Sequence, residues 1–432
     1  MIYPYSIENN HIFANNSQIT NLYFCFPYRG VGGVSLLFLR IAEELYKTKA
    51  IRCNLIDYED GFMAKNMDKN SANLVIYSDS NEVVIPADSL IVFQSLTPWS
   101  IFPSLKINSG ARIFFWNCHP FNLIPTLPGL RILMQRSKFF SRCILATLLR
   151  SYRTKVVKMI KILLKEKALV FMDTTNIDYT EKYLGIEIDS PSFLPIPTKS
   201  SNFSISNRIF EPKKTFNIAW IGRIVDFKYF ILKRTLIDLN NIHNCFHLNL
   251  HIDIVGYGDF QKQLKKDVSN LSNITVKFID FIAPEELDSF LLSEVDLLIA
   301  MGTSALEGAK LGLPTILLDL SYSEVPDGYL YKWFHEGSGY VLGGEITPAN
   351  FKKNNNSLNN CIDTVISNFD NISMLSRQFF LKNHSIAMVS SKFLDQISES
   401  SCSWMMLENA NVIKPGLIYS LFRFLRKKIQ PL

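Results

Sequence analysis

Residues 295–318 read Val295-Asp-Leu-Leu-Ile-Ala-Met-Gly302-Thr-Ser-Ala-Leu-Glu307-Gly-Ala-Lys-Leu-Gly312-Leu-Pro314-Thr-Ile-Leu-Leu318. Two short, mostly apolar runs, 295–300 and 314–318, flank a segment whose pattern predicts a helix over Ser304–Leu311. Gly312 is placed to end that helix, and Pro314 cannot continue it. A strand, a helix and a second strand in succession predict two parallel strands joined by a crossover helix.

The same alternation continues in both directions along the chain. In the first half, the strand Leu22–Phe26 leads through the glycine turn Arg29–Ser35 into a helix at Leu36–Tyr46 and a strand at Asn54–Asp57. Further elements are a helix at Pro284–Leu292 and strands at Asn73–Tyr77, Ser89–Phe93, Arg112–Trp116, Ala168–Met172, Asn217–Ile221, His251–Val255 and Ile274–Ile279. We therefore predict an α/β protein with two Rossmann-like doubly wound domains facing a cleft.

The domain boundary is predicted from composition. Residues 199–215 are rich in Ser, Asn, Lys and Pro, which is typical of a linker. They separate an N-terminal domain, 1–198, from a C-terminal domain, 216–385, and residues 386–432 form a further C-terminal segment. Within the first domain, Leu130–Lys167 is helical in pattern and strongly basic, with Glu166 as its one acidic residue.

Composition narrows the class of protein. The 432 residues are 47% hydrophobic and 19% charged, which indicates a globular chain. No apolar run approaches the roughly 18 residues that span a bilayer, and the first residues do not resemble a signal peptide. The seven cysteines show no metal-binding spacing and favour the reducing cytoplasm. A net charge of +6 is modest and does not by itself indicate a nucleic-acid partner.

The segment Gly302–Pro314 has two interpretations. Ser304 and Glu307 fit a capping box, in which the serine caps the helix and the glutamate bonds back to the cap N–H. Alternatively, the helix start at Gly302-Thr303-Ser304 offers N–H groups to a phosphate, and Glu307 accepts hydrogen bonds from a ribose.

Two further glycine-containing strand ends are candidate donor-binding positions. Gly222-Arg223, with Lys228 five residues later, places two cations where backbone can approach a ligand, and together they suit a diphosphate. The alternative is a pair of solvated surface cations. Gly256 and Gly258 end the next strand, where glycines often serve only to turn the chain.

The N-terminal half offers weaker signals. Arg29-Gly-Val-Gly32-Gly33 is not a dinucleotide fingerprint, because Ser35 stands where the third glycine is required, so no NAD site is predicted. His119 follows a strand and suits either a catalytic base or a structural turn. His243, His247 and His251 are spaced by four residues but lead into a strand, and no metal site is predicted there.

The order of these motifs resembles the retaining GT-B glycosyltransferases of family four (glycosyl transferases group 1), which build bacterial capsule and O-antigen polysaccharides. The resemblance is specific in the C-terminal half, in Ile218–Ile224, Ile254–Asp259 and Ser304–Thr315. It implies that Arg223 and Lys228 bind the diphosphate of a nucleotide sugar, that Glu307 binds the ribose, and that Gly32, Gly33 and His119 belong to a glycine loop and a site histidine. It also implies that residues 386–432 pack back on the first domain.

One position departs from that family. Retaining members carry two glutamates separated by seven residues, but the position eight before Glu307 is Ile299. The resemblance thus implies a metal-independent, cofactor-free hexosyltransferase acting on a saccharide or lipid-linked acceptor, while retention of stereochemistry stays open. A nucleotide-sugar epimerase with the same fold and a non-catalytic scaffold of a membrane-bound assembly are the alternatives.

The C-terminal tail suggests a membrane surface as a further partner. Leu417, Leu421 and Leu425 fall on one helical stripe, flanked by Arg423, Arg426, Lys427 and Lys428. Such a helix can lie in the interface of an anionic membrane, and Leu130–Lys167 provides a second basic surface. The alternative is an ordinary packed helix. We therefore expect a cytoplasmic protein that associates peripherally with the membrane.

Overall fold

The computed structural model describes residues 21–30, 32–78, 80–94, 104–125, 133–134, 137–201, 215–242 and 248–414. The chain divides into two compact units. The first comprises Met1–Pro195 together with Ser390–Leu432, and the second comprises Ile196–Val389. Most of the predicted linker, the predicted amphipathic tail, His243 and His247 lie outside the described residues.

The first unit is built on a seven-stranded parallel sheet with the strand order β3-β2-β1-β5-β7-β8-β9. Its strands are β1 (Asn21–Cys25), β2 (Cys53–Asp57), β3 (Ala72–Ile76), β5 (Ser89–Gln94), β7 (Arg112–Asn117), β8 (Leu169–Phe171) and β9 (Ser192–Phe193). A separate parallel pair is formed by β4 (Val83–Ile85) and β6 (Leu105–Ile107). The predicted strands of this half are confirmed to within two residues at each end.

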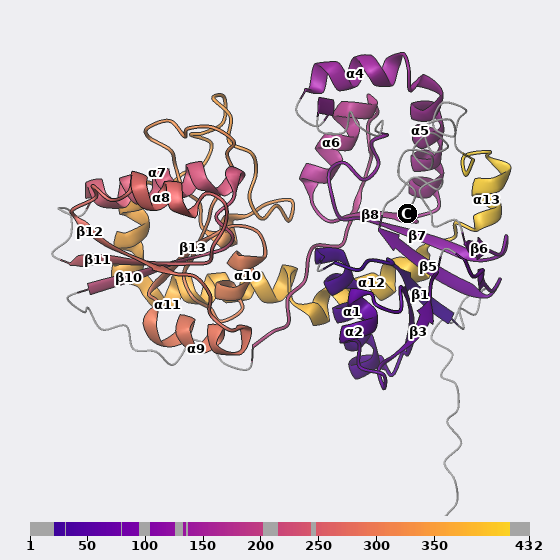
Figure 1. Ribbon diagram of the computed structural model, residues 1–432, viewed down its shortest axis with the longest axis horizontal. Helices are drawn as coiled ribbons and strands as arrows, with labels where there is room; N and C mark the ends of the chain where they lie inside the picture. The colour runs from indigo at the N-terminus through magenta and orange to yellow at the C-terminus, as the bar shows by residue number, and fades with distance from the viewer. Residues whose placement is uncertain are drawn as a thin grey trace, which may run out of the picture. The chain divides into compact units, whose positions relative to one another are not determined.

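Helices cover both faces of this sheet, which is the doubly wound arrangement (Figure 1). They are α1 (Gly33–Lys49), α2 (Phe62–Asn66), α4 (Lys138–Ala146), α5 (Arg150–Lys165), α6 (Thr174–Leu184), α13 (Trp404–Asn409) and the part of α12 (Ile386–Glu399) from Ser390 onward. On one face the ring of Trp116 stacks on Phe393 of α12, with their centroids 6.0 Å apart. The predicted helical segment Leu130–Lys167 is confirmed as α4 and α5 in its described part.

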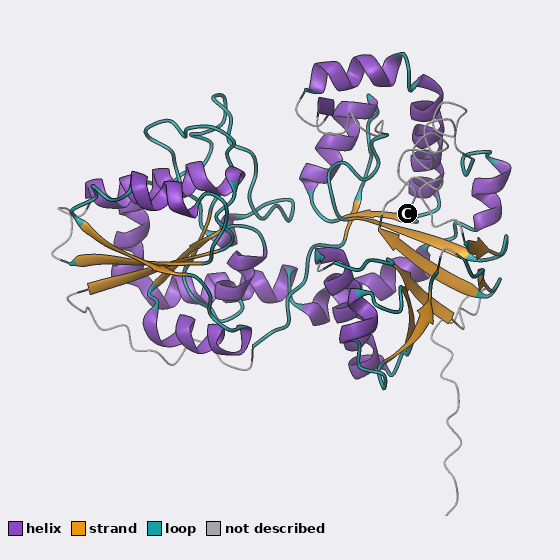
Figure 2. Ribbon diagram, in the orientation of Figure 1, coloured by secondary structure: helices purple, strands orange, loops and turns teal. Residues whose placement is uncertain are grey.

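The second unit has a five-stranded parallel sheet with the order β12-β11-β10-β13-β14. Its strands are β10 (Thr215–Ile221), β11 (Asn249–Val255), β12 (Ile274–Ile279), β13 (Leu297–Ala300) and β14 (Thr315–Leu317). Its helices are α7 (Asp226–Ile242), α8 (Gln261–Asp267), α9 (Pro284–Glu294), α10 (Thr303–Ala309), α11 (Leu358–Asn383) and the short 3₁₀ helix η4 (Phe334–Glu336). Figure 2 shows α7 and α8 over one face of the sheet and α9 under the other.

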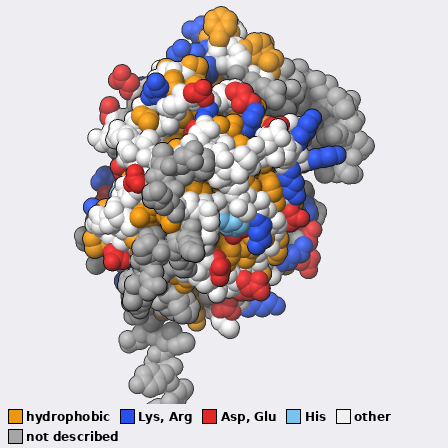
Figure 3. Space-filling model, turned by 90° about the vertical axis from the view of Figure 1, so that its left-hand side faces the viewer, with side chains coloured by type: hydrophobic (Ala, Val, Ile, Leu, Met, Phe, Trp, Pro, Cys, Tyr) orange, Lys and Arg blue, Asp and Glu red, His pale blue; other side chains and the backbone are white. Residues whose placement is uncertain are grey.

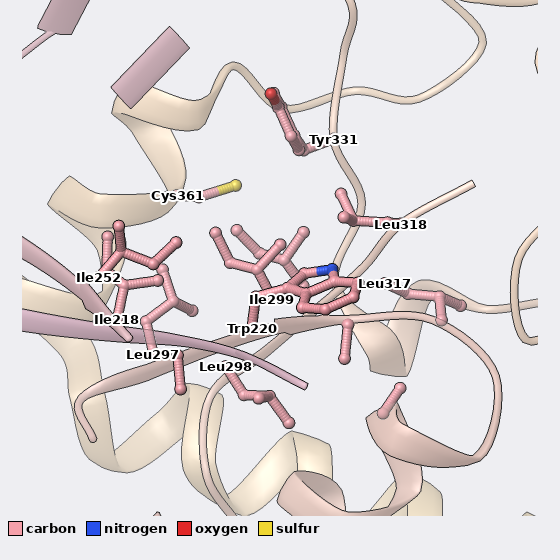
Figure 4. Packing of buried hydrophobic residues seen from close by; sticks show 14 of the residues in the cluster. Ile218, Trp220, Ile252, Leu297, Leu298, Ile299, Leu317, Leu318, Tyr331 and Cys361 are labelled. Carbon is pink, nitrogen blue, oxygen red and sulfur yellow. The ribbon is translucent and has the colours of Figure 1, made fainter. Parts of the chain in front are cut away.

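The core of the second unit explains why its strands read as continuous apolar runs. All four residues of β13 are buried, because helices cover both faces of the sheet. Trp220 is fully buried beside Ile299, with Leu317 and Leu318 nearby (Figure 4). Two Rossmann-like units are therefore present, as predicted.

The left-hand side of Figure 1 belongs to the second unit, and Figure 3 views it face on. Acidic and basic side chains are interspersed over this face rather than gathered by sign. None of the helices within the described ranges is long and apolar enough to cross a lipid bilayer.

Candidate functional site

The candidate residues of the second unit gather at one edge of its sheet. Parallel strands end on the same side, so the loops that follow β11, β10 and β13, which are neighbours in the sheet, lie next to one another. These loops carry Gly256 and Gly258, Gly222 and Arg223, and Gly302, respectively. The tertiary structure therefore brings together the three motifs that the sequence separates by up to about eighty residues.

The loops after β10 and β11 are joined backbone to backbone. The Gly222 N–H donates to the Val255 carbonyl (3.0 Å), and the Ile224 N–H donates to the Tyr257 carbonyl (3.1 Å). A Cβ on Gly256 would lie 2.0 Å from the Gly222 oxygen, and one on Gly258 would lie 2.4 Å from the Ile224 oxygen. Both glycines are therefore required for packing, and direct contact with a donor remains a prediction for them.

Arg223 and Lys228 are the cations of this edge. Arg223 is exposed, while Lys228 is partly buried in the first turn of α7, with Nζ 6.0 Å from the centroid of the Trp220 ring. Burial lowers the pKa of Lys228, and the positive charge of Arg223 lowers it further. No carboxylate among the described residues forms an ion pair with either cation. Two nearby cations with no acidic partner favour the binding of an anion.

The start of α10 differs from the predicted capping box. The helix begins at Thr303 and its N-cap is Gly302, so Ser304 is the second helical residue and caps nothing. Gly302 has φ +63°, a left-handed conformation that lets the chain turn from β13 into the helix within two residues. Its N–H donates to the Leu342 carbonyl (2.6 Å), and the Ala305 N–H is already bonded to the Gly302 carbonyl (3.2 Å).

Glu307 belongs to an ion cluster on the side of α10. Its Oε2 lies 2.5 Å from Nζ of Lys310, which is also 2.8 Å from Oδ1 of Asp288 in α9. Burial alone would lower the pKa of Lys310, but the charge of Glu307 and the hydrogen bond to Asp288 raise it. Glu307 is therefore held by Lys310 and does not cap the helix, and its contact with a ribose stays a prediction.

In the resembling family a second glutamate stands eight residues before the position of Glu307. In this chain that position is Ile299. Ile299 is fully buried within β13, and its backbone is paired with Trp220 on one side and Ile316 on the other. Only Met301 and Gly302 separate β13 from α10. A carboxylate at position 299 would point into the core, and the two-residue connection has no room for an acidic loop.

The glycine loop of the first unit is held by a residue that the sequence analysis did not single out. Asp57, at the end of β2, is buried and accepts N–H groups from Tyr28 (2.8 Å), Tyr58 (2.9 Å), Met63 (2.8 Å) and Ala64 (3.2 Å). Its position as the last residue of a predicted strand was the available signal. These four bonds use both oxygens of the carboxylate, so Asp57 fixes the backbone of the segments that follow β1 and β2.

Other residues of the glycine loop have mainly structural contacts. Arg29 pairs with Asp60 (2.9 Å) and lies 3.9 Å above the ring centroid of Tyr58. Gly32 is the N-cap of α1 and Gly33 is its first residue, so the helix starts three residues earlier than predicted. A Cβ on Gly33 would meet no atom within 4 Å, so space for packing does not demand glycine there.

His119 stabilises the turn after β7. Its Nδ1 accepts the N–H of Phe121 (3.2 Å), and its own N–H donates to Oδ1 of Asn117 (3.4 Å). The histidine is exposed, so the structural role predicted as an alternative is present, and a catalytic role remains a prediction.

Asp173, the N-cap of α6, was not singled out by the sequence analysis. Burial raises the pKa of Asp173 to about 6, and its bonds to the helix N–H groups oppose that shift.

Metal ligands are not assembled in the described ranges. No group of three or more His, Cys, Asp or Glu residues there could hold a metal ion. His251 contacts Asp253, with Nε2 3.1 Å from Oδ1.

Comparison with known proteins supports the fold. No protein-family model matches the chain, and no curated protein is similar in sequence. Among solved structures, a glycosyltransferase from Rickettsia africae has a TM-score of 0.51 at 15% identity over 88% of this chain and 97% of its own. An apo structure of OtsA has a TM-score of 0.50 at 11% identity over 87% and 98%. At these identities the likeness shows the fold alone, which is the two-domain GT-B fold.

Proposed function

We propose that the protein is a glycosyltransferase that moves a sugar from a nucleoside-diphosphate sugar to an acceptor hydroxyl. The observation that carries the proposal is the pair Arg223 and Lys228 at the carboxyl edge of a parallel sheet. Desolvating a lysine beside another cation is unfavourable, so such a pair is expected where an anionic ligand provides the missing charge. A diphosphate carries that charge and accepts the bidentate hydrogen bonds of an arginine.

The proposed reaction requires few protein groups beyond these two cations. The bond between the anomeric carbon and the diphosphate oxygen breaks, its electron pair leaves with the nucleoside diphosphate, and the acceptor oxygen bonds to the anomeric carbon as its proton departs. Arg223 and Lys228 offset the charge that develops on the leaving group. In this proposal they take the role that a metal ion has in other transferases, and no cofactor takes part.

The remaining donor contacts extend from the same edge. Glu307 stands one turn inside α10, where its second carboxylate oxygen can accept ribose hydroxyls while the first stays paired with Lys310. We propose that the backbone at Gly302-Thr303-Ser304 contacts the phosphates or the sugar, with the N–H groups of Thr303 and Ser304 as donors because that of Gly302 is bonded to Leu342. Gly32, Gly33 and His119 are proposed to contribute to the site from the first unit.

The acceptor and the setting are inferred from the motif resemblance. We propose a saccharide or lipid-linked saccharide acceptor in the synthesis of a bacterial surface polysaccharide such as capsule or O-antigen. We propose accordingly that the enzyme works in the cytoplasm, peripherally on the inner membrane face. Because Ile299 replaces the glutamate of the retaining family, the stereochemical outcome is left to the assay.

The test is a calorimetric binding screen of the full-length protein against the common nucleoside diphosphates. One of them is expected to bind, and Arg223→Ala and Lys228→Ala are each expected to weaken that binding at least tenfold. The corresponding nucleotide sugars are then assayed for hydrolysis and transfer, with the product anomer assigned by NMR.

Two outcomes would reject the proposal. A protein that binds no nucleoside diphosphate is a non-catalytic member of the fold. A protein that converts a nucleotide sugar into its isomer in the absence of an acceptor is an epimerase.

A further inference from the structure

The connection between β14 and α11, residues 318–357, borders the candidate site of the second unit. Its backbone is bonded at two points of the carboxyl edge of the sheet. The Gly302 N–H donates to the Leu342 carbonyl (2.6 Å), and the Ser321 N–H donates to the Phe227 carbonyl (2.9 Å). Phe227 lies in the first turn of α7, which also carries one of the two proposed diphosphate ligands. This connection, drawn in orange in Figure 1, therefore lies against both the start of α10 and the start of α7.

The buried carboxylate of Asp319 fixes the shape of this connection. Asp319 is 1% exposed, and its Oδ1 accepts the N–H of Gly344 (2.8 Å). Its carboxylate also pairs with Lys332 (3.1 Å) and Lys353 (3.7 Å). Burial opposes the charged form, but the charges of the two lysines hold the pKa of Asp319 below its ordinary value. The backbone at Gly344 is therefore tied to the end of β14.

Tyr322 and Glu345 are brought to this edge by the connection. The Leu320 N–H donates to the Gly344 carbonyl (2.7 Å), and Leu320 pairs with Glu345. Tyr322 follows two residues after Leu320, and the centroid of its ring lies 6.1 Å from that of Phe227. Tyr322 is nevertheless 61% exposed. A large aromatic side chain is thus presented to solvent beside the first turn of α7.

Two carboxylates act on Tyr322. Burial of part of the side chain raises the pKa of Tyr322, and the negative charges of Asp226 and Glu345 raise it further. Both acidic residues are exposed, and both lie within electrostatic reach of the tyrosine. Strand β13, in contrast, offers no polar side chain, because all four of its residues are apolar and buried. A carboxylate for a ligand at this edge has to come from another segment, and the connection supplies one.

An aromatic ring beside carboxylates suits a neutral sugar. The ring can cover the apolar face of the sugar, and a carboxylate accepts hydrogen bonds from its hydroxyl groups. A uronic acid would bring a further negative charge to this position, and like charges repel. The diphosphate is proposed to bind at Arg223 and Lys228, so the sugar attached to it is expected beside the first turn of α7, where Tyr322 lies.

We propose that Tyr322 and Glu345 select the donor sugar. The ring of Tyr322 covers one face of a neutral hexose, and the carboxylate of Glu345 accepts its hydroxyl groups and repels the carboxylate of a uronic acid. This inference rests on the proposed function and deepens it, because it names the class of sugar that the nucleoside diphosphate carries. It concerns the sugar alone, so it is separable from the binding of the diphosphate.

The experiment is isothermal titration calorimetry of the full-length protein with UDP, GDP and ADP, and with nucleotide sugars paired so that the two members differ only at C6. The pairs are UDP-glucose and UDP-glucuronic acid, UDP-galactose and UDP-galacturonic acid, GDP-mannose and GDP-mannuronic acid, and ADP-glucose and ADP-glucuronic acid. The wild type should bind the neutral member of its preferred pair at least about fivefold more tightly than the acidic one. Glu345→Gln should weaken binding of the neutral member at least about fivefold and reduce the preference to within about twofold.

The matched control for Glu345→Gln is Glu324→Gln. Glu324 is an exposed glutamate of the same connection, but it is paired with Lys233 of α7 (2.8 Å). This control should bind every ligand within about twofold of the wild type. Tyr322→Ala should weaken binding of the neutral nucleotide sugar at least about fivefold, whereas Tyr322→Phe keeps the ring and should stay within about twofold. All four variants should keep the wild-type affinity for the nucleoside diphosphate, which also shows that they are folded.

The possible failures are distinguishable. A wild-type protein that binds no nucleoside diphosphate would reject the proposed function and this inference with it. If the diphosphate binds, three results would overturn the inference alone. The first is equal affinity of the wild type for neutral and acidic nucleotide sugars, and the second is undiminished binding of the neutral sugar by Glu345→Gln. The third is an equal loss of diphosphate and nucleotide-sugar binding in Tyr322→Ala, which would assign the ring to the nucleoside.

Discussion

The ammonium group of Lys228 lies 3.0 Å from the point that a Cβ on Gly222 would occupy. The missing side chain of Gly222 is thus what lets the lysine lie across the end of β10. The same glycine is bonded through its N–H to Val255, so the loop that carries Arg223 is fixed in place. Backbone hydrogen bonds fix the loop that carries Arg223, and Lys228 belongs to the first turn of α7.

If Arg223 and Lys228 bind the diphosphate together, as a phosphate clamp, removing either side chain should lower turnover. Arg223→Ala and Lys228→Ala should each lower kcat by roughly a hundredfold, because each removes one donor that offsets charge on the leaving group. Lys262→Ala, an exposed lysine of α8, is the matched control and should have little effect. Similar losses at all three positions, in steady-state assays, would indicate general electrostatic attraction and not a clamp.

Substitutions of Glu307 and Asp288 can distinguish ligand binding from ion pairing within the protein. Both carboxylates contact Lys310, but only Glu307 is proposed to bind ribose. Glu307→Gln should weaken nucleotide binding more than tenfold, since hydrogen bonds to charged groups are worth about 1.5–3 kcal/mol. Asp288→Asn should leave affinity unchanged in the same calorimetric titration. Equal affinities for the two variants would show that Glu307 does not bind the ribose and only takes part in the ion cluster.

Position 299 is predicted not to accept the glutamate of the resembling family. Ile299→Glu should destabilise the protein by about 4 kcal/mol or more, because it buries a carboxyl group in β13 without a partner. Ile299→Val should cost only about 1 kcal/mol. Urea unfolding provides the comparison. A folded Ile299→Glu protein with raised activity would show that the strand can open to present a carboxylate.

The buried side chain of His384 should make the folding stability of the protein depend on pH. The histidine is fully buried, its Nδ1 contacts the Ile196 carbonyl (3.0 Å), and burial lowers its pKa from 6.5 to about 4. Between these two values the unfolded chain binds a proton that the folded chain does not. Stability from this group is therefore present above about pH 6.5 and is lost as the pH falls towards 4, by up to about 3 kcal/mol.

The measurement for His384 is the melting temperature as a function of pH. His384→Gln should be less stable at neutral pH but should show a flatter profile between pH 6.5 and 4 than the wild type. The comparison concerns the slopes, because the substitution also alters a buried contact. Parallel profiles would assign the acid sensitivity to other groups.

The strands and their glycine-containing ends were readable from the sequence because they depend on local patterns. Continuous apolar runs such as Leu297–Ala300 indicate strands covered on both faces, and parallel strands must end at one edge. That reasoning was sufficient to place Gly222, Gly256 and Gly302 at the carboxyl ends of parallel strands, and the strand order in the tertiary structure makes them neighbours. It was also sufficient to predict two doubly wound units, because the alternation of strands and helices is repeated in each half.

The sequence failed where a contact comes from distant residues. Ser304 and Glu307 satisfied the spacing of a capping box, but Gly302 takes the cap because the Leu342 carbonyl binds its N–H. The ribose contact of Glu307 stays a prediction, but its ion pair with Lys310, which Asp288 of another helix also contacts, was not predicted. Asp57 looked like the end of a strand, and only the fold gives it four N–H groups.

What the sequence determined by itself is the order of the elements and the chemistry at their ends, since both follow from near neighbours in the chain. Only the tertiary structure decided which of those residues face one another. Ile299 illustrates the difference. Its identity shows that a glutamate is missing, but the pairing of β13 between β10 and β14 shows that no side chain at that position can leave the core, because its backbone is fixed in the centre of the sheet.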